Sequence, residues 1–463
     1  MSESIAEMVL PGTYIEVRAE GLIGAASIAT GNIGIVGAAQ RGPKGVVRAI
    51  GSLADALDLF GPADPTLSLI RGLEQAFAGG ASSVYAVRIA NGVPLAASLA
   101  LAGAFTVVAG PPRDPGTTPD PDAGTWGNAI TVTVDVAGGT PTVTVELGAT
   151  KETFTGADAA AVVAAMASSR LVHTSAVQNN PTLAAMATTN LAGGTNGANA
   201  TAADVADGLA ALEDQPVNLV VVPGFGASTV AGAVGAHLER TENEARERIA
   251  VLGVTDPGTA TNLAAPVAEV AGISNARIVL VTPGLVVTDR ASGKPTSIGA
   301  SYLACMVAGK LATVAPHVSL TNKTVPADGL DVAYSGAAAK NLLQNRMLVV
   351  RRKFGFQVVK AISTDPGAFR QVSVRRTVDY AKAGVRSGSD PYIGKLNNAR
   401  VRAALKATLD GFLSQMVLDE MLVGYELGVT ATRAQEINGI CSVTMTLLPT
   451  FSIDFVRVTM NLQ

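Results

Sequence analysis

The chain has 463 residues and a formal net charge of -3, and 48% of its residues are hydrophobic while only 15% are charged. This length supports two to four domains with sizeable cores, and the low charge density is typical of proteins that bury large interfaces. Two separate cysteines exclude a disulfide scaffold, no apolar run approaches the ~18 residues of a membrane span, and the acidic start MSESIAEM lacks the basic region of a secretory signal.

Both ends of the chain have the composition of isolated β-strands. The N-terminal strand comprises Thr13, Tyr14, Ile15, Glu16 and Val17, which alternate between two faces. Residues 449–463 read PTFSIDFVRVTMNLQ, in which the apolar phase changes between Phe455 and Val456 and so indicates a bulge or burial on both faces. Neither strand has an adjacent hairpin partner. Because an unpaired apolar strand is prone to association, we expect both to pair with a sheet elsewhere.

Strands and helices alternate in residues 22–90 and 200–361. Continuous apolar runs, typical of strands buried on both faces, read NIGIVGAA, SVYAVRIA, VNLVVVPG, IAVLGVTDPG and ARIVLVTPG. Helical segments such as TAADVADGLAALED, opened by the capping residue Thr201, lie between them. The pattern predicts a doubly wound, mostly parallel sheet. Residues 345–360 are predicted to form a strand pair that turns near Phe354 and Gly355.

The composition changes in residues 91–199, which are rich in Ala, Thr and Gly and begin with a segment dense in Pro, Gly and Asp. The stretches ITVTVDV and TVTVELG alternate around Gly138-Gly139, a pattern that predicts a β-hairpin. Residues 91–199 are therefore predicted to be a β-rich domain inserted into the α/β core.

The sequence holds no motif that supports catalysis. The stretch Gly37–Gly45, GAAQRGPKG, superficially suggests a phosphate loop, but Pro43 interrupts the Gly-Lys pair and no Ser or Thr follows it. A structural turn is the favoured interpretation. The three histidines, His173, His237 and His317, lie far apart in sequence and do not have metal-ligand spacing. We therefore expect no catalytic residue, no metal and no cofactor.

One strong charge asymmetry lies in residues 370–406, where nine bases face two acids, a net of +7. On a predicted helix over 369–386, Arg375, Lys382 and Arg386 share one face beside an apolar stripe. On a second predicted helix over 397–418, Arg402 and Lys406 are four residues apart. The functional interpretation is an acidic partner surface, and the alternative is an ordinary solvated face. Nucleic acid is the weaker choice, because no aromatic residues interleave with these bases.

Several stretches, in this order, resemble the contractile tail sheath proteins of bacteriophages and related contractile injection systems. They read PGTYIEV, GIVGAAQRGPKG, AFAGGASSVYAVRI, GTWGNAITVTV, FRQVSVRRTVDY, LNNARVRAALKATLDGFL and FSIDFVRVTMNL. The resemblance covers both ends and the middle of the chain, whereas residues 291–343 depart from the family pattern.

The resemblance implies a structural, non-enzymatic subunit that forms a helical homopolymer around an inner tail tube and contracts to drive the tube through a cell envelope. It also implies that the terminal arms add strands to neighbouring subunits. In the C-terminal arm the residues expected to do so are Phe455, Val456, Arg457, Val458, Thr459, Met460 and Leu462, while the preceding segment is expected to pack locally. The bases expected to contact the tube are Arg375, Arg376, Lys382, Arg386, Lys395, Arg400, Arg402 and Lys406.

The expected fold is therefore mixed, multidomain α/β, with a doubly wound core, an inserted β-rich domain and extended terminal strand arms. Its predicted parts are an arm at 1–21, a core at 22–90 and 200–361, an outward-facing insertion at 91–199, a tube-facing α+β domain at 362–448 and an arm at 449–463. Baseplate and tail terminator proteins are further expected partners, without direct nucleic acid binding or membrane insertion. The expected location is the virion tail or a contractile particle, after assembly in the cytoplasm of a bacterial host. The alternatives are a nucleotide-binding α/β enzyme, which rests on the sheet pattern alone, and a non-contractile shell or surface-array protein.

Overall fold

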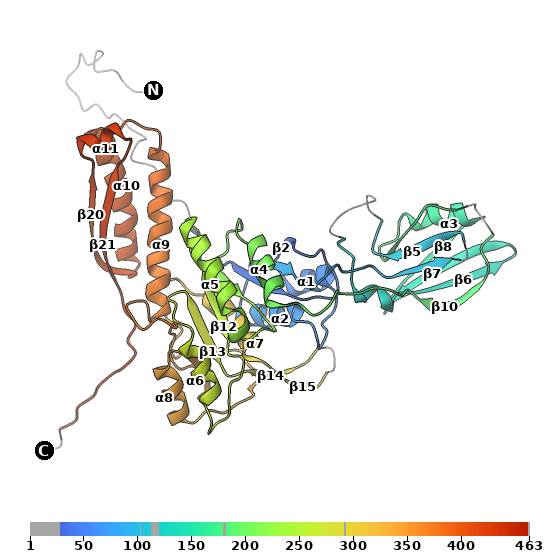
Figure 1. Cartoon of the computed structure of the whole chain (residues 1–463), viewed down its shortest axis with the longest axis horizontal. Helices are drawn as coiled ribbons and strands as arrows, with labels where there is room; N and C mark the ends of the chain where they lie inside the picture. Colours follow the sequence, from blue (N-terminus) through green and yellow to red (C-terminus); the bar gives the residue numbers. More distant parts are fainter. Residues whose placement is uncertain (1–27, 102, 113–119, 179–181, 291–292, 462–463) are drawn as a thin grey trace, which may run out of the picture. The chain divides into compact units, whose positions relative to one another are not determined.

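The computed structural model describes residues 28–461 except 102, 113–119, 179–181 and 291–292, and the strand predicted at Thr13–Val17 and the arm residue Leu462 lie outside this part (Figure 1). The chain divides into two units. The first, the core unit, comprises Gly31–Val314 and Leu320–Arg370. The second, the C-terminal unit, contains Ala315–Ser319 and the chain from Gln371 onward.

A nine-stranded sheet organises the core unit, in the order β16-β19-β18-β13-β12-β11-β1-β3-β2. Its central strands run parallel and are β1 (Ile33–Gly37), β3 (Val84–Arg88), β11 (Leu219–Val221), β12 (Ile249–Gly253), β13 (Ile278–Thr282) and β18 (Leu348–Arg352). The antiparallel strands at the edges are β2 (Val47–Ile50), β19 (Phe356–Val358) and β16 (Thr324–Val325). The strand pair predicted to turn near Phe354 and Gly355 is thus confirmed as β18 and β19.

Helices cover both faces of this sheet because its central strands are apolar on both sides. They are α1 (Leu53–Phe60), α2 (Leu69–Gly79), α4 (Ala202–Ala211), α5 (Ala227–Asn243), α6 (Ala264–Ala271), α7 (Ala300–Ala312) and α8 (Gly336–Gln344). Neighbouring residues of β1 show the two layers, since Ile35 lies against Gly72 of α2 and Val36 lies against Gly208 of α4. The predicted doubly wound α/β core is confirmed.

Helices α2 and α7 approach each other at two glycines. A Cβ atom placed on Gly79 would meet the Met306 carbonyl oxygen at 2.2 Å, and one on Gly309 would meet the Ala76 carbonyl oxygen at 2.1 Å. Only glycine permits this spacing, so the two helices pack backbone to backbone. The core unit also contains a small sheet made of β14 (Leu285–Thr288), β15 (Pro295–Ile298) and β17 (Gly329–Leu330).

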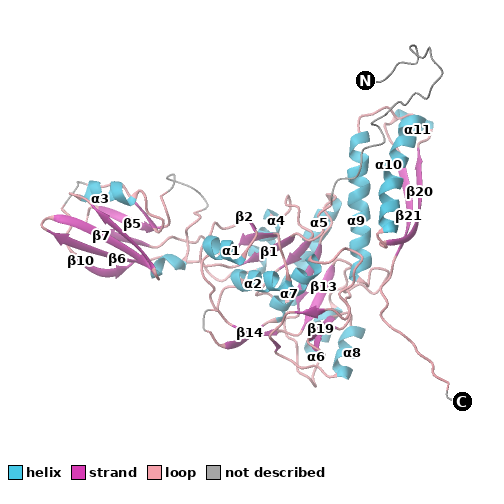
Figure 2. Ribbon diagram, turned by 180° about the vertical axis from the view of Figure 1, so that it is seen from behind, coloured by secondary structure: helices cyan, strands magenta, loops and turns pink. Residues whose placement is uncertain are grey.

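The segment 91–199 forms two small sheets around one apolar core that includes Trp126 (Figure 2). One sheet contains β4 (Ser98–Leu101), β5 (Phe105–Ala109) and β9 (Val172–Thr174), and the other contains β6 (Thr131–Ala137), β7 (Thr140–Leu147), β8 (Thr150–Thr155) and β10 (Met186–Asn190). The short 3-10 helix η3 (Thr125–Ala129) precedes β6, and α3 (Ala159–Met166) follows β8. The predicted hairpin is confirmed as β6 and β7, with Gly138 at φ 58° and Gly139 at φ 82°, conformations that favour glycine.

The C-terminal unit pairs two long helices with a β-hairpin. Its elements are α9 (Val372–Ser389), the 3-10 turn η4 (Asp390–Tyr392), α10 (Ala399–Leu418), β20 (Leu422–Thr430), α11 (Arg433–Ile437) and β21 (Ser442–Pro449). The two predicted helices are present as α9 and α10, whereas β20 and α11 were not predicted. With these elements the mixed, multidomain α/β class is confirmed. Within the described ranges, no helix combines the length and apolar content needed to cross a membrane.

Candidate interaction surfaces

The hairpin β20–β21 covers only part of the helical layer beneath it. Tyr425, Leu427 and Leu447 pack against an apolar cluster supplied by α9 and α10, yet all three remain half-buried. Two helices packed side by side span roughly 20 Å, which is about the width of four strands spaced ~4.8 Å apart. The hairpin supplies two strands, and among the described residues neither of its outer edges is paired. The sheet therefore has room for one more strand at each edge.

After β21 the chain continues as an extended segment, residues 450–461, which we call the C-terminal arm. No strand or helix is assigned within it. Its apolar side chains are largely exposed, namely Phe451 at 62%, Ile453 at 82%, Phe455 at 84%, Val456 at 79%, Val458 at 72% and Met460 at 85%. Arg457 and Thr459 are exposed as well. This surface has the alternating apolar composition of a strand but has no sheet to bury it.

Hydrogen bonds attach the root of the C-terminal arm to its own unit. The Thr450 amide donates to the Met421 carbonyl at 3.2 Å, and the Ser452 amide donates to Gln371 Oε1 at 3.3 Å. Gln371 Nε2 in turn donates to Asp454 Oδ2 at 3.0 Å. The segment before Val456, which was predicted to pack locally, is thus held to its own unit by these hydrogen bonds, while the side chains of Phe451, Ile453 and Phe455 stay exposed.

Two of the predicted tube-facing bases lie inside the C-terminal unit. Arg375 is 7% exposed and pairs with Asp379 one helical turn later, and Arg376 is 6% exposed. Arg376 donates to the carbonyl oxygens of Thr30 at 3.2 Å and Ala315 at 3.4 Å, and burial lowers the pKa of its guanidinium to about 10. The expectation that these two bases face outward is therefore wrong, because the first turns of α9 are enclosed on all sides.

The other predicted bases lie closer to the surface. Lys382 and Arg386 are half-buried, whereas Lys395, Arg400 and Lys406 are exposed. The Lys395 ammonium lies 4.9 Å from the centre of the Tyr392 ring. Arg402 is half-buried and donates to Glu436 Oε1 at 2.9 Å, and hydrogen bonds from Arg433 and then Arg402 lower the pKa of that carboxyl. The exposed bases are thus spread over the η4 region and α10 and do not form one continuous stripe.

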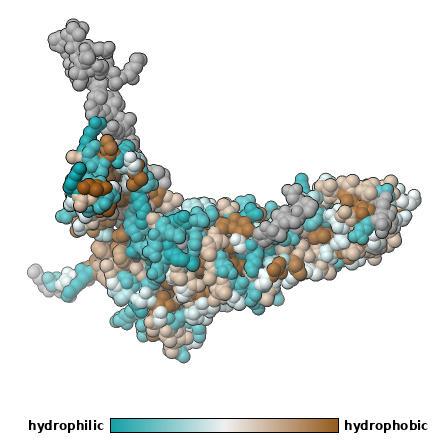
Figure 3. All heavy atoms as spheres, turned by 45° about the horizontal axis from the view of Figure 1, so that its top comes forward, coloured by the Kyte–Doolittle hydropathy of each residue, from teal (hydrophilic) through white to brown (hydrophobic). Residues whose placement is uncertain are grey.

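A cavity of about 390 Å³ lies beside these bases, between the turn that follows η4 and the hairpin end. Exposed apolar residues surround it, including Ile393 at 80%, Leu396 at 78% and Ile440 at 49%. Figure 3 shows hydrophobic groups interrupting the hydrophilic surface of this unit. The cavity has the character of a surface groove and contains no group of acids, bases or nucleophiles arranged for catalysis.

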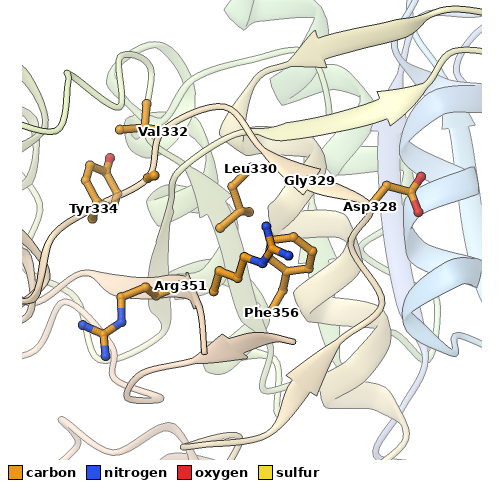
Figure 4. A pocket seen from close by; sticks show the side chains of 9 residues that line it. Asp328, Gly329, Leu330, Val332, Tyr334, Arg351 and Phe356 are labelled. Carbon is orange, nitrogen blue, oxygen red and sulfur yellow. The ribbon is translucent and has the colours of Figure 1, made fainter. Parts of the chain in front are cut away.

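A second cavity, of about 470 Å³, lies in the core unit beside β18 and β19. Arg351, Arg352 and Phe356 line it together with Asp328 and Tyr334. Figure 4 shows Leu330 and Phe356 between Tyr334 on one side and Asp328 on the other. Burial raises the pKa of Tyr334 to about 12, and its hydroxyl donates to the Pro257 carbonyl at 2.6 Å. The tyrosine is therefore a neutral structural group and not an acid or base for chemistry.

The turn at Gly37–Gly45 connects the core to the insertion. Arg41 pairs with Asp122 at 2.6 Å and lies 4.2 Å from the centre of the Trp126 ring. Lys44 donates to the Gly92 carbonyl at 3.0 Å. The neighbouring Arg88, fully buried, donates to the carbonyl oxygens of Gly42 and Ala123, and burial lowers its pKa to about 10. These bases bind carbonyl groups and a carboxylate of the protein itself. The turn is therefore structural, as the sequence predicted, although the sequence did not predict these partners.

The three histidines stay apart in the structure. His237 is fully buried and accepts a hydrogen bond from Arg248 at 2.8 Å, and burial together with the charge of Arg248 lowers its pKa to about 3. Arg248 also caps the end of the α4 region through the carbonyl oxygens of Leu212, Glu213 and Gln215. Among the residues that the structure describes, no cluster of His, Cys, Asp and Glu is arranged to hold a metal ion.

Comparisons with known proteins point to one family. A family model described as the phage tail sheath protein central domain matches residues 198–364, and a second, described as the phage tail sheath C-terminal domain, matches residues 364–463. The chain is also similar to the tail sheath protein of Mycobacterium phage Bxz1, with 23% identity over 239 residues. That match includes 49% of this chain and spans 40% of the length of the curated relative.

Solved structures share the fold over almost the whole chain. The sheath tail protein from Desulfitobacterium hafniense superposes with a TM-score of 0.69 at 20% identity, covering 95% of this chain and 100% of that one. The anti-feeding prophage helical sheath in its contracted state superposes with a TM-score of 0.57 at 15% identity, covering 98% and 99%. At these identities the likeness concerns the fold.

Proposed function

The chain belongs to the phage tail sheath family, and we propose that it is the structural, non-enzymatic subunit of a contractile sheath around an inner tube. The observation that carries this proposal is that one chain has both an exposed C-terminal arm and a two-stranded sheet whose outer edges are unpaired among the described residues. The arm of one copy is a donor strand, and the hairpin β20–β21 of another copy is an acceptor. Each copy has one donor arm and one acceptor hairpin, so the same contact can repeat from subunit to subunit and build a polymer.

Strand addition supplies a contact that is strong enough to persist. About six backbone hydrogen bonds per arm, at ~0.5–1.5 kcal/mol each, give roughly 3–9 kcal/mol before any side chain is buried. Val456 and Val458 then cover the half-buried apolar side chains of the hairpin. The predicted N-terminal strand Thr13–Val17 is the candidate for the second open edge.

Contraction requires other contacts to break while the strands hold. Exposed ion pairs contribute only about 0–1 kcal/mol each, so polar contacts between globular parts can rearrange. We assign the tube contact to the exposed bases Lys395, Arg400 and Lys406, with the half-buried Lys382, Arg386 and Arg402 nearby. Arg375 and Arg376 are buried within the unit, so we do not assign them to the tube contact. An acidic tube surface is the complementary partner.

The remaining assignments follow from this role. Baseplate and tail terminator proteins meet the two ends of the polymer, the particle is a virion tail or a related contractile device, and assembly takes place in the cytoplasm of a bacterial host. Similarity to a contracted helical sheath supports this assignment. The alternative of a nucleotide-binding enzyme rests on the sheet pattern alone, and the loop Gly37–Gly45 adds no support to it, because Arg41 and Lys44 are held by Asp122 and the Gly92 carbonyl.

Truncation of the chain after Thr450 tests the proposal. The truncated protein is expected to fold, because the removed side chains are exposed, and to remain as soluble subunits. Negative-stain microscopy of the full chain is expected to show ribbed tubes. Tubes of normal appearance from the truncated protein would rule out the strand-donation mechanism, and tight nucleotide binding by the full chain would favour the enzyme.

A further inference from the structure

The three-residue turn 353–355 between β18 and β19 holds a bulky residue at a positive φ. Phe354 has φ 51° and Gly355 has φ 102°, and the Lys353 amide donates to the Gly355 carbonyl at 2.7 Å. A positive φ favours Gly, Asn or Asp and disfavours bulky side chains. The Phe354 side chain is nevertheless 92% exposed, so no apolar burial within the described structure offsets this conformation.

Bases surround this exposed aromatic ring. Arg351, Arg352 and Lys353 immediately precede Phe354, and Arg352 and Lys353 are exposed. None of the three side chains forms a hydrogen bond or an ion pair with another described residue. We call residues 351–355 the Phe354 turn.

Residues that reduce the stability of the fold and make no stabilising contact within it are candidates for binding a partner. Exposed aromatic rings and arginines are the side chains that most often dominate the energy of protein interfaces. The cavity of about 470 Å³ that Arg351 and Arg352 line lies directly beside the turn (Figure 4). A complementary surface must therefore supply carboxylates together with apolar groups.

Helix α1, at the opposite edge of the same sheet, has this chemistry. The sheet order places β18, β19 and β16 at one edge and β2, which leads into α1, at the other. Asp55 and Asp58 are exposed on α1, and neither carboxylate is paired with a base among the described residues. Leu53 and Leu57 lie half-buried beside them. Arg48 on β2 is also exposed, so the acidic character belongs to the helix and not to the whole edge.

We propose that the Phe354 turn of one copy docks on helix α1 of a neighbouring copy. This inference rests on the proposed polymer and names a lateral contact within it that is separate from the terminal arms. Because donor and acceptor are different surfaces at opposite edges of one sheet, the contact is head-to-tail. A head-to-tail contact forms a closed ring only if the rotation between neighbouring subunits closes the circle. Otherwise it repeats into a helical array.

The variant Phe354→Asn separates folding from assembly. Asparagine fits the positive φ, so the monomer is expected to keep or gain stability in urea unfolding. Loss of the aromatic ring is expected to raise the protein concentration needed for tube formation ~10-fold or more. Val93→Asn, which changes a 77% exposed apolar residue of the insertion, is the matched control and is expected to assemble normally. Normal assembly of Phe354→Asn would overturn the proposal.

Charge reversal identifies the acceptor. The pair Arg352→Glu with Lys353→Glu, and the pair Asp55→Lys with Asp58→Lys, are each expected to impair tube formation. All four changes in one chain restore complementarity between neighbours and are expected to restore tubes. Two impaired pairs without recovery in the combined variant would contradict the assignment to α1.

Crosslinking of the unmodified protein distinguishes this contact from the sheath function itself. A carbodiimide joins an amine to a carboxylate in direct contact, and mass spectrometry is expected to find Lys353 joined to Asp55 or Asp58 of another copy. This crosslink in small oligomers, without any tubes, would support the contact while contradicting the sheath role. Tubes that lack the crosslink would support the sheath role and overturn the contact.

Discussion

Gln371 and Asp454 are 83 residues apart in sequence, yet Gln371 Nε2 donates to Asp454 Oδ2 at 3.0 Å. Gln371 is the residue immediately before α9, and Asp454 lies in the root of the C-terminal arm. The same glutamine accepts from the Ser452 amide at 3.3 Å. The Gln371 side chain therefore helps to set the direction in which the arm leaves its unit, whereas the apolar side chains of Phe451, Ile453 and Phe455 stay largely exposed.

Replacing Gln371 with Ala is expected to impair assembly more than folding. The lost hydrogen bonds are partly exposed, so the free energy of unfolding should fall by no more than ~1 kcal/mol. Assembly should slow, because the arm must be ordered from a wider range of directions. Light scattering during tube formation measures this rate. Gln415→Ala is the control, since Gln415 Nε2 donates to Asp419 Oδ1 at 2.8 Å at the end of α10. Equal rates of tube formation for both variants would contradict the role of Gln371.

The arm residues are expected to tolerate polar substitution in the monomer but not in the polymer. Val456 and Val458 are 79% and 72% exposed, so aspartate at both positions should leave the urea unfolding curve unchanged. In the polymer each buried valine contributes ~1.5–3 kcal/mol, and tubes should not form at the concentration used for the wild type. Isoleucine at both positions is the control, and it should assemble. A less stable monomer in the aspartate variant would show that the arm packs within its own chain.

Arg376 and Lys406 are predicted to differ in what they stabilise. Arg376→Met removes the buried guanidinium that donates to the Thr30 and Ala315 carbonyl groups through part-buried hydrogen bonds, and it should reduce the free energy of unfolding by ~1–3 kcal/mol. Lys406→Met, on the exposed face of α10, should leave stability unchanged and weaken binding to the inner tube. Chemical denaturation and co-sedimentation with purified tube protein measure the two effects. A stability loss for Lys406→Met would place that side chain within the fold instead of at the tube.

The buried His237 predicts a specific loss of stability in acid. Its pKa is about 3 in the folded state, against an ordinary value of 6.5, so the unfolded chain binds a proton that the folded chain excludes. Stability is therefore fully present above pH 6.5 and falls by ~1.4 kcal/mol per pH unit as the pH drops from 6.5 toward 3. Urea unfolding at pH 7 and pH 5 measures the change.

His237→Gln isolates this contribution from that of the carboxylates. Glutamine offers Arg248 a hydrogen-bond acceptor that does not titrate, so the difference in stability between pH 7 and pH 5 should shrink by about 2 kcal/mol. Identical pH dependence in wild type and His237→Gln would mean that the folded protein accommodates the charged imidazole.

The local signals in the sequence were sufficient wherever a short pattern decided the structure. Apolar runs predicted the buried strands, Gly138-Gly139 predicted the hairpin β6–β7, and Gly355 marked the turn between β18 and β19. Strand β20 was missed although Val423, Tyr425, Leu427 and Val429 alternate in its sequence. Gly424 and Gly428 lie on the other face of this strand and lower its strand propensity, so its formation depends on pairing with β21.

The sequence by itself determined the fold class, the alternating apolar composition of the C-terminal arm and the absence of a recognisable catalytic motif, because periodicity and composition are properties of neighbouring residues. Only the tertiary structure decided which side chains remain exposed and can contact a partner. Arg375 and Lys406 are equally basic in sequence, but enclosure of the first turns of α9 buries Arg375, whereas Lys406 stays exposed. Phe354 shows the opposite outcome, since an apolar residue that composition assigns to a core is left exposed by its turn. Burial depends on contacts between segments distant along the chain, and no local pattern encodes it.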